Sequence, residues 1–142
     1  MLFALFSWSG RMGRLSYLGY SFLLVAILVG LGMLLLLPLR NAPDAKGVTI
    51  AITVVLGVMG ILGGFSLAAK RLHDLDMSAW HYVWIVFVPS ILNGFGVAMQ
   101  QGGTNLPGLM ATLVAGLISV VVGLFLLLWP GTDGTNRFGE RP

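Results

Sequence analysis

The stretch that organises this chain is Lys70-Arg71-Leu72-His73-Asp74-Leu75-Asp76-Met77-Ser78-Ala79-Trp80, its only dense cluster of ionisable side chains. Long stretches without Lys, Arg, Asp or Glu flank it, at residues 47–69 and 77–132. Of the 142 residues, 57% are hydrophobic and only 9% are charged, whereas a soluble domain typically has about 25% charged residues. A water-soluble fold of this size cannot hide so much apolar surface, so the composition predicts a membrane protein.

The uncharged runs on both sides of this stretch predict four transmembrane helices, because a helix needs roughly 20 apolar residues to cross a bilayer. Their expected positions are about residues 17–37, 48–69, 80–99 and 108–128. We therefore expect one all-α integral membrane domain over residues 1–142, folded as a four-transmembrane-helix bundle.

Polar and helix-breaking residues indicate how the last two helices begin and where one of them breaks. Asp76 or Ser78 is a suitable N-cap for the third helix, and Thr104 or Asn105 for the fourth. Pro89, with the polar and glycine residues that follow it, is expected to interrupt the third helix.

The positions of the basic residues predict the orientation in the membrane, because cytoplasmic loops carry an excess of Lys and Arg. With four spans, the N-terminal segment, the central charged stretch and the C-terminal tail share one side. Six of the eight basic residues lie on that side, and only Arg40 and Lys46 lie on the other. Both termini are therefore expected to be cytoplasmic.

Small and polar residues within the spans predict how the helices pack. Gly57, Gly60 and Gly64 cluster in the second span, and small residues let membrane helices approach closely. Asn93 is the strongly polar side chain near the middle of the third span, where we expect it to make one interhelical hydrogen bond.

The charged residues of the expected cytoplasmic face form the candidate site. In the structural interpretation, Arg71 pairs with Asp74, Arg137 and Asp133 join them, and the tail is tied beneath the helices. In the second interpretation, the arginines converge on an anionic group, because the guanidinium fork matches phosphate and basic residues near helix ends attract anionic lipid. The candidate residues are Arg11, Arg14, Arg71, His73, Asp74, Trp80 and Arg137.

Catalysis and metal binding are the least favoured interpretations of this cluster. His73 and Asp74 are adjacent on a helix and do not face each other. His73 and His81 are eight apart, not the four apart of a helical metal pair. The absence of cysteine excludes disulfides and thiolate metal sites, so we expect no metal and no cofactor. The net charge of +3 is too small and scattered to argue for nucleic acid.

Three stretches in this order resemble a family of small bacterial inner-membrane proteins catalogued as domain of unknown function 805. They are Gly10-Arg11-Met12-Gly13-Arg14, Arg71-Leu72-His73-Asp74 with Ser78-Ala79-Trp80, and Gly131-Thr132-Asp133-Gly134-Thr135-Asn136-Arg137-Phe138-Gly139. The central motif of the family usually continues as Ser-Gly-Trp and an aromatic residue, whereas this chain has Ala79 and His81 at those places. The resemblance implies a multi-pass protein of the bacterial inner membrane with four helices, and it implies no activity.

These observations predict a non-enzymatic inner-membrane protein. Its cytoplasmic Arg/His/Asp cluster is expected to organise the bundle and to bind anionic lipid or a partner protein. The expected partners are membrane lipid and either further copies of the chain or another membrane protein. The alternative is a homo-oligomeric channel or carrier, although charged residues, the usual mark of ion paths, are missing from the predicted spans. A membrane enzyme is the third interpretation.

Overall fold

The computed structural model describes residues 9–40, 42–103 and 105–140. It contains four long helices, α2 (Arg14–Leu36), α3 (Lys46–Asp74), α4 (Trp80–Met99) and α5 (Leu106–Leu128), and a short 3-10 helix, η1 (Pro43–Ala45), before α3. Each long helix is apolar enough and long enough to cross a membrane. The chain is therefore an all-α, multi-pass membrane protein.

The charged stretch lies partly inside α3, which continues beyond the expected span of residues 48–69 to Asp74. The helix ends in a Schellman motif. The N–H of Met77 donates to the carbonyl of Leu72 at 2.8 Å, and the N–H of Asp76 donates to the carbonyl of His73 at 3.1 Å. Asp76 takes a φ of 58°, a left-handed conformation that Asp tolerates better than most residues. Arg71 and His73 in the last turn complement the partial negative charge of the helix end.

The structure confirms an expected N-cap for α5 but not for α4. Asn105 caps α5, and its side chain accepts a hydrogen bond from the N–H of Gly108 at 2.8 Å. The N-cap of α4 is Ala79 rather than Asp76 or Ser78, although the Ser78 hydroxyl accepts a hydrogen bond from the N–H of Trp80 at 3.3 Å. The other proposed cap of α5, Thr104, lies outside the described residues.

The expected interruption of the third helix is wrong. Pro89 is buried inside a continuous α4 that runs from Trp80 to Met99. Membrane helices tolerate proline because neighbouring groups satisfy the backbone that it leaves unpaired.

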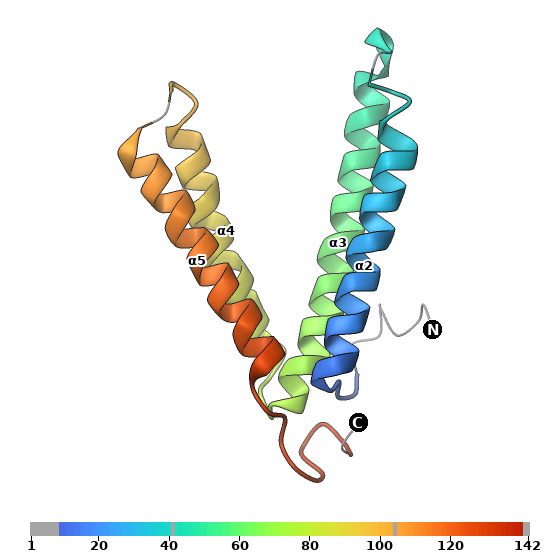
Figure 1. Cartoon of the computed structure of the whole chain (residues 1–142), viewed down its shortest axis with the longest axis vertical. Coiled ribbons are helices and arrows are strands. Elements are labelled where there is room, and N and C mark those ends of the chain that lie inside the picture. Colours follow the sequence, from blue (N-terminus) through green and yellow to red (C-terminus); the bar gives the residue numbers. More distant parts are fainter. Residues whose placement is uncertain (1–8, 41, 104, 141–142) are drawn as a thin grey trace.

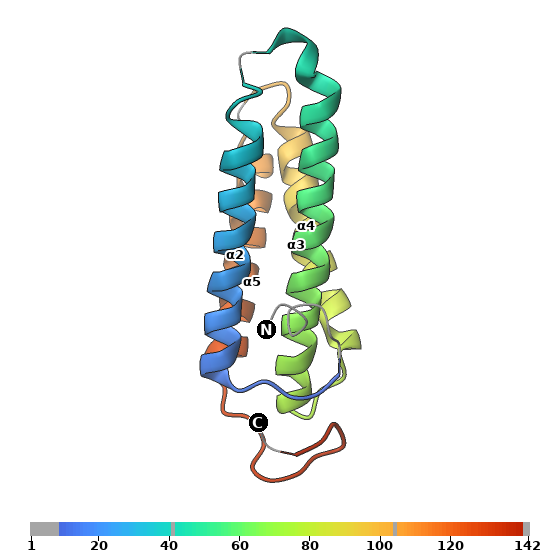
Figure 2. The same cartoon turned by 90° about the vertical axis from the view of Figure 1, so that its right-hand side faces the viewer.

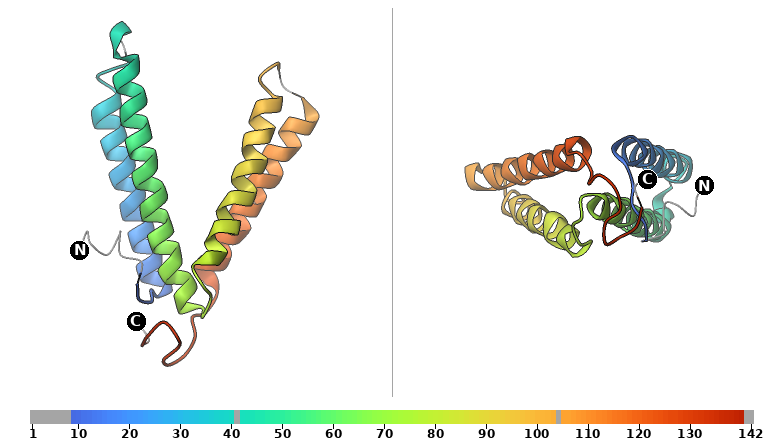
Figure 3. Two further views of the ribbon diagram at one scale, coloured as in Figure 1. Left: turned by 180° about the vertical axis from the view of Figure 1, so that it is seen from behind. Right: turned by 90° about the horizontal axis from the view of Figure 1, so that it is seen from below.

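The four long helices form two antiparallel hairpins, α2–α3 and α4–α5, which meet at one end and diverge toward the other (Figure 1). The start of α2, the turn between α3 and α4, and the C-terminal tail lie together at the closed end (Figure 2). The views from behind and from below show the same separation of the hairpins (Figure 3). The four helices of the expected bundle are thus packed as two hairpins that meet at one end only. Buried apolar side chains form two clusters toward the closed end: Met12, Leu24 and Leu67, and Ala68, Leu72 and Leu126.

Gly57, Gly60 and Gly64 of α3 were expected to pack together against a neighbouring helix, but they have different surroundings in the structure. A Cβ added at Gly60 would lie 3.2 Å from Cδ1 of Leu28 on α2, and one at Gly64 would lie 3.4 Å from the Tyr82 hydroxyl on α4. A Cβ added at Gly57 would meet nothing within 4 Å. Two of the three positions therefore adjoin neighbouring helices, and Gly57 faces open space.

Asn93 is exposed and lines a hollow of about 290 Å³ between α4 and α5. Ser90, Thr112 and Ser119 also line it. Within the described part of the chain, Asn93 makes none of the expected interhelical hydrogen bonds. Its carboxamide is left at the surface of one hairpin, at membrane depth.

Candidate functional site

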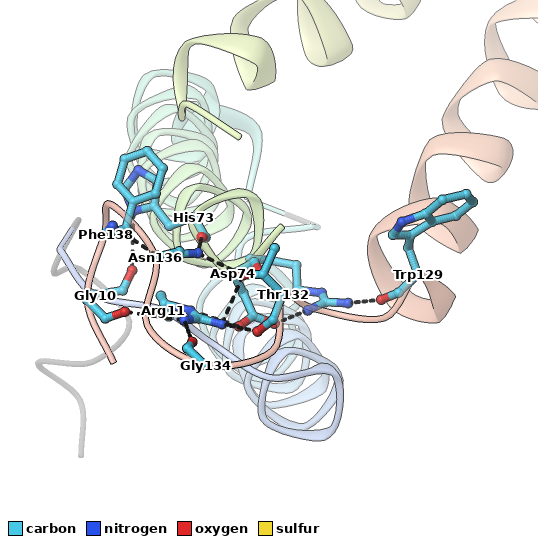
Figure 4. A network of polar contacts seen from close by, with 11 residues as sticks. Gly10, Arg11, His73, Asp74, Trp129, Thr132, Gly134, Asn136 and Phe138 are labelled. Carbon is cyan, nitrogen blue, oxygen red and sulfur yellow. Dashed lines mark hydrogen bonds and ion pairs between the residues drawn. The ribbon is translucent and has the colours of Figure 1, made fainter. Parts of the chain in front are cut away.

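Three segments that are far apart in the sequence meet at the closed end. They are the segment before α2, the last turns of α3, and the tail that follows α5 (Figure 4). We call the side chains of Arg11, Arg71, Asp74, Thr132 and Asn136 the polar hub. Among the described residues, no buried side-chain nitrogen or oxygen lacks a hydrogen-bond partner.

The carboxylate of Asp74 lies at the centre of the polar hub and is shared by two arginines. Its Oδ1 accepts hydrogen bonds from Nε and Nη2 of Arg11 at 3.1 and 2.9 Å. Its Oδ2 accepts one from Nη1 of Arg71 at 2.5 Å. The side chains of Arg11, Arg71 and Asp74 are only 1%, 0% and 6% exposed. One negative charge thus serves two buried positive charges, and charge-assisted hydrogen bonds of this kind are among the stronger ones in proteins.

Arg11 also holds the tail through the two terminal nitrogens of its guanidinium. Nη1 donates to the carbonyl of Gly134 at 2.6 Å and to that of Gly139 at 3.2 Å. Nη2 donates to the carbonyl of Thr132 at 2.7 Å. Every nitrogen of this guanidinium is therefore engaged inside the protein.

Arg71 connects the two hairpins. Its Nε donates to the carbonyl of Leu126 at 2.6 Å, and its Nη2 donates to the carbonyl of Trp129. Both carbonyls belong to the C-terminal end of α5, which an adjacent cation stabilises. Arg14 adds a weaker link, because its Nη1 donates to the carbonyl of Leu128 at 3.3 Å.

The tail folds back under α3 and donates hydrogen bonds to the carbonyls of the last turn of this helix. The N–H and hydroxyl of Thr132 donate to the carbonyl of Asp74 at 2.8 and 3.0 Å. The Asn136 amide donates to the carbonyl of His73 at 2.8 Å. A Cβ added at Gly131 would lie 2.1 Å from Oδ2 of Asp74, so only glycine fits where the tail passes the carboxylate.

Thr132, Asn136 and Gly131 were not among the candidate residues that the sequence identified. All three belong to the terminal stretch that carries the family resemblance. That resemblance was the sequence feature that could have identified them as part of the site.

His73 and Arg137 lie at the edge of the polar hub. The His73 ring stacks on Phe138 with centroids 4.0 Å apart, and its Nδ1 lies 3.2 Å from the carbonyl oxygen of Gly10. Arg137 pairs with Asp76 at 3.1 Å, with both side chains about half exposed. The left-handed turn at Asp76 presents both its carboxylate and its backbone carbonyl to Arg137, and the carbonyl accepts a hydrogen bond from Arg137 Nη2 at 2.5 Å. Arg137 thus pairs with Asp76 rather than joining the Arg71–Asp74 pair as expected.

Trp80 is the candidate residue that the structure leaves outside the cluster. It begins α4 and is 67% exposed. An amphipathic ring at the end of a span suits the membrane interface, so its position accords with a contact to lipid.

The geometry leaves little capacity for an anionic ligand at the polar hub itself. The donors of Arg11 and Arg71 are directed at Asp74 and at backbone carbonyls. A hollow of about 270 Å³ lies beside Arg14, but Asp74 is among the residues that line it. Within the described residues, no three His, Asp, Glu or Cys side chains lie close enough together to hold a metal ion.

Four candidate membrane spans joined by this polar hub define a small polytopic membrane protein. The chain belongs to the family described as Protein of unknown function (DUF805), which matches residues 5–140. The match includes all three motif segments, so the polar hub is built from the stretches that carried the resemblance. No curated protein and no solved structure matches the chain.

Proposed function

We propose that this is a non-enzymatic membrane protein whose polar hub holds two helical hairpins at a fixed angle, so that the gap between their open ends receives a partner. The observation that carries the proposal is the position of Arg71. It bonds Asp74 on its own hairpin and the carbonyls of Leu126 and Trp129 on the other. The proposed partners are another membrane protein or a second copy of the chain, with membrane lipid around them.

Spin labels at the open ends of the hairpins test this proposal. The chain has no cysteine, so an Ala42→Cys/Gln101→Cys variant carries labels at two exposed positions only. We expect one narrow distance distribution in lipid nanodiscs, and a clearly broader one when Arg71→Gln is added. Arg137→Gln is the matched control, because its ion pair with Asp76 is about half exposed and lies outside the four long helices. A distribution that Arg71→Gln leaves unchanged would contradict a clamp at this residue.

We further propose that the polar hub faces the cytoplasm, in the inner membrane of a bacterium. The excess of Lys and Arg at the closed end supports this orientation. A single cysteine at Thr135→Cys should resist an impermeant thiol reagent in intact cells, whereas Gln101→Cys at the opposite end should react. Both positions are exposed, so a difference in labelling reports sidedness. Labelling of Thr135→Cys with protection of Gln101→Cys would invert the proposed topology.

A homo-oligomeric channel or carrier is the second candidate, and one observation favours it. The hollow with Asn93, Ser90, Thr112 and Ser119 gives one hairpin a polar line at membrane depth, where exposed polar side chains are costly in lipid. Copies arranged around this line would cover it. The third candidate, a membrane enzyme, has no comparable observation in its favour.

A further inference from the structure

The end opposite the polar hub contains a second basic site. A hollow of about 650 Å³ lies where α2 passes into α3. Its lining consists of two basic residues, one hydroxyl and four apolar side chains: Arg40, Lys46, Thr49, Leu36, Leu39, Ala42 and Ile50. The hollow is therefore amphiphilic, with positive charge beside an apolar wall.

The basic side chains of this hollow, unlike those of the polar hub, have no bonding partner in the part of the chain that the structure describes. Arg40 and Lys46 are both exposed. Within the described residues, neither side chain makes a hydrogen bond or an ion pair. Asp44, the acid of the same turn, is not among the residues that line the hollow. A negative group entering here would meet donors that are free to turn toward it.

The backbone around the hollow adds to its positive character. Lys46 is the first residue of α3, whose N-terminus has no side-chain cap and no acid in its first turn. The partial positive charge of such a helix start favours anions. The carbonyls at the end of α2 are partly used by the turn itself, since Leu36 accepts from the N–H of Leu39 at 3.1 Å and Leu37 from that of Arg40 at 3.2 Å.

The apolar part of the lining indicates what carries the negative group. Leu36 ends one candidate span and Ile50 lies in the first turns of the next, so the hollow sits at the depth where lipid headgroups meet acyl chains. Basic pockets between membrane helices are places where anionic headgroups bind. Long cationic side chains near helix ends also extend toward that layer.

We propose that this hollow binds the phosphate of an anionic phospholipid. Arg40 and Lys46 contact the phosphate oxygens, and an acyl chain lies along Leu36, Leu39 and Ile50. The site is separate from the polar hub and does not depend on the function proposed above. Inorganic phosphate has the same charged chemistry but lacks the chain, so the two sources can be told apart.

Native mass spectrometry of the detergent-purified protein, titrated with dioleoylphosphatidylglycerol, tests this site. We expect each neutralising variant, Arg40→Gln and Lys46→Gln, to weaken retention of this lipid about fivefold and the double variant about 20-fold, given the usual contribution of one basic residue near anionic lipid. Retention of the zwitterionic dioleoylphosphatidylcholine should change much less. Arg137→Gln removes the same charge at an exposed pair elsewhere and should keep retention at the wild-type value.

Two further measurements distinguish a phospholipid from inorganic phosphate as the ligand, and this hollow from the polar hub as the binding site. Displacement of the lipid by millimolar inorganic phosphate would show that phosphate alone suffices, and persistence of the lipid would show that the acyl chain is needed. If the double variant retains dioleoylphosphatidylglycerol as well as the wild-type protein does, the proposal is overturned. A loss confined to Arg14→Gln also overturns it, because it would place the lipid beside the polar hub. The single variants alter exposed side chains that have no partners among the described residues, so they answer the question even if the double variant unfolds.

Discussion

Asp74→Ala is expected to lower the free energy of unfolding by about 3–5 kcal/mol, because removal of one partner leaves a buried charge uncompensated. Here the loss affects two guanidinium groups at once, since Arg11 and Arg71 share the Asp74 carboxylate. Chemical or thermal unfolding in a mild detergent measures the change. Asp76→Asn is the matched control, because asparagine also tolerates the left-handed φ of 58° at this position. The ion pair of Asp76 with Arg137 is about half exposed, and exposed pairs contribute only about 0–1 kcal/mol.

The double-mutant cycle with Arg71 separates the ion pair from other effects of the substitutions. Arg71→Ala alone should also destabilise strongly, because it leaves Asp74 with one cation and frees the carbonyls of Leu126 and Trp129. The Arg71→Ala/Asp74→Ala variant should be less unstable than the two single losses added together, since loss of Asp74 then leaves only Arg11, and no longer Arg71, uncompensated. Strictly additive losses would mean that these residues do not act as a pair.

The spans and the central pair of the polar hub could be predicted because they depend on local rules. Hydropathy over about 20 residues defines a span whatever it packs against, and Arg71 and Asp74 are three apart on one helix, where side chains meet. The Asn105 cap rests on the same kind of short-range chemistry. The tail was expected beneath the helices because topology places it on the same side as the central stretch.

The remaining contacts depend on three-dimensional positions that local patterns do not carry. Arg137 pairs with Asp76 because that residue takes the left-handed conformation at the end of α3. Arg71 reaches backbone carbonyls of α5, and carbonyls leave no mark in a sequence. The separation of the hairpins was also missed. Apolar spans predict contact with apolar surroundings, and in a membrane both lipid and another helix provide them.

The second hairpin has its own point of close approach, which the sequence analysis did not identify. A Cβ added at Gly96 of α4 would lie 2.6 Å from the Thr112 hydroxyl, 2.7 Å from the carbonyl oxygen of Gly108 and 2.9 Å from the N–H nitrogen of Thr112. Gln100 bonds across the same place, because its amide donates to the Gly96 carbonyl at 3.2 Å and to the Thr112 hydroxyl at 3.3 Å. The backbones of α4 and α5 are therefore in direct contact here.

Gly96→Ala is accordingly expected to destabilise the protein by about 1–3 kcal/mol, the usual cost of adding atoms to a closely packed site. Part of the contact is backbone, which cannot turn aside as a long side chain can. Gly94→Ala is the matched control, since a Cβ there would meet nothing within 4 Å. In a helix interior, alanine in place of glycine otherwise stabilises by up to about 1 kcal/mol, so the two variants should shift thermal unfolding in detergent in opposite directions. Equal shifts for both would mean that α4 and α5 do not approach each other at Gly96.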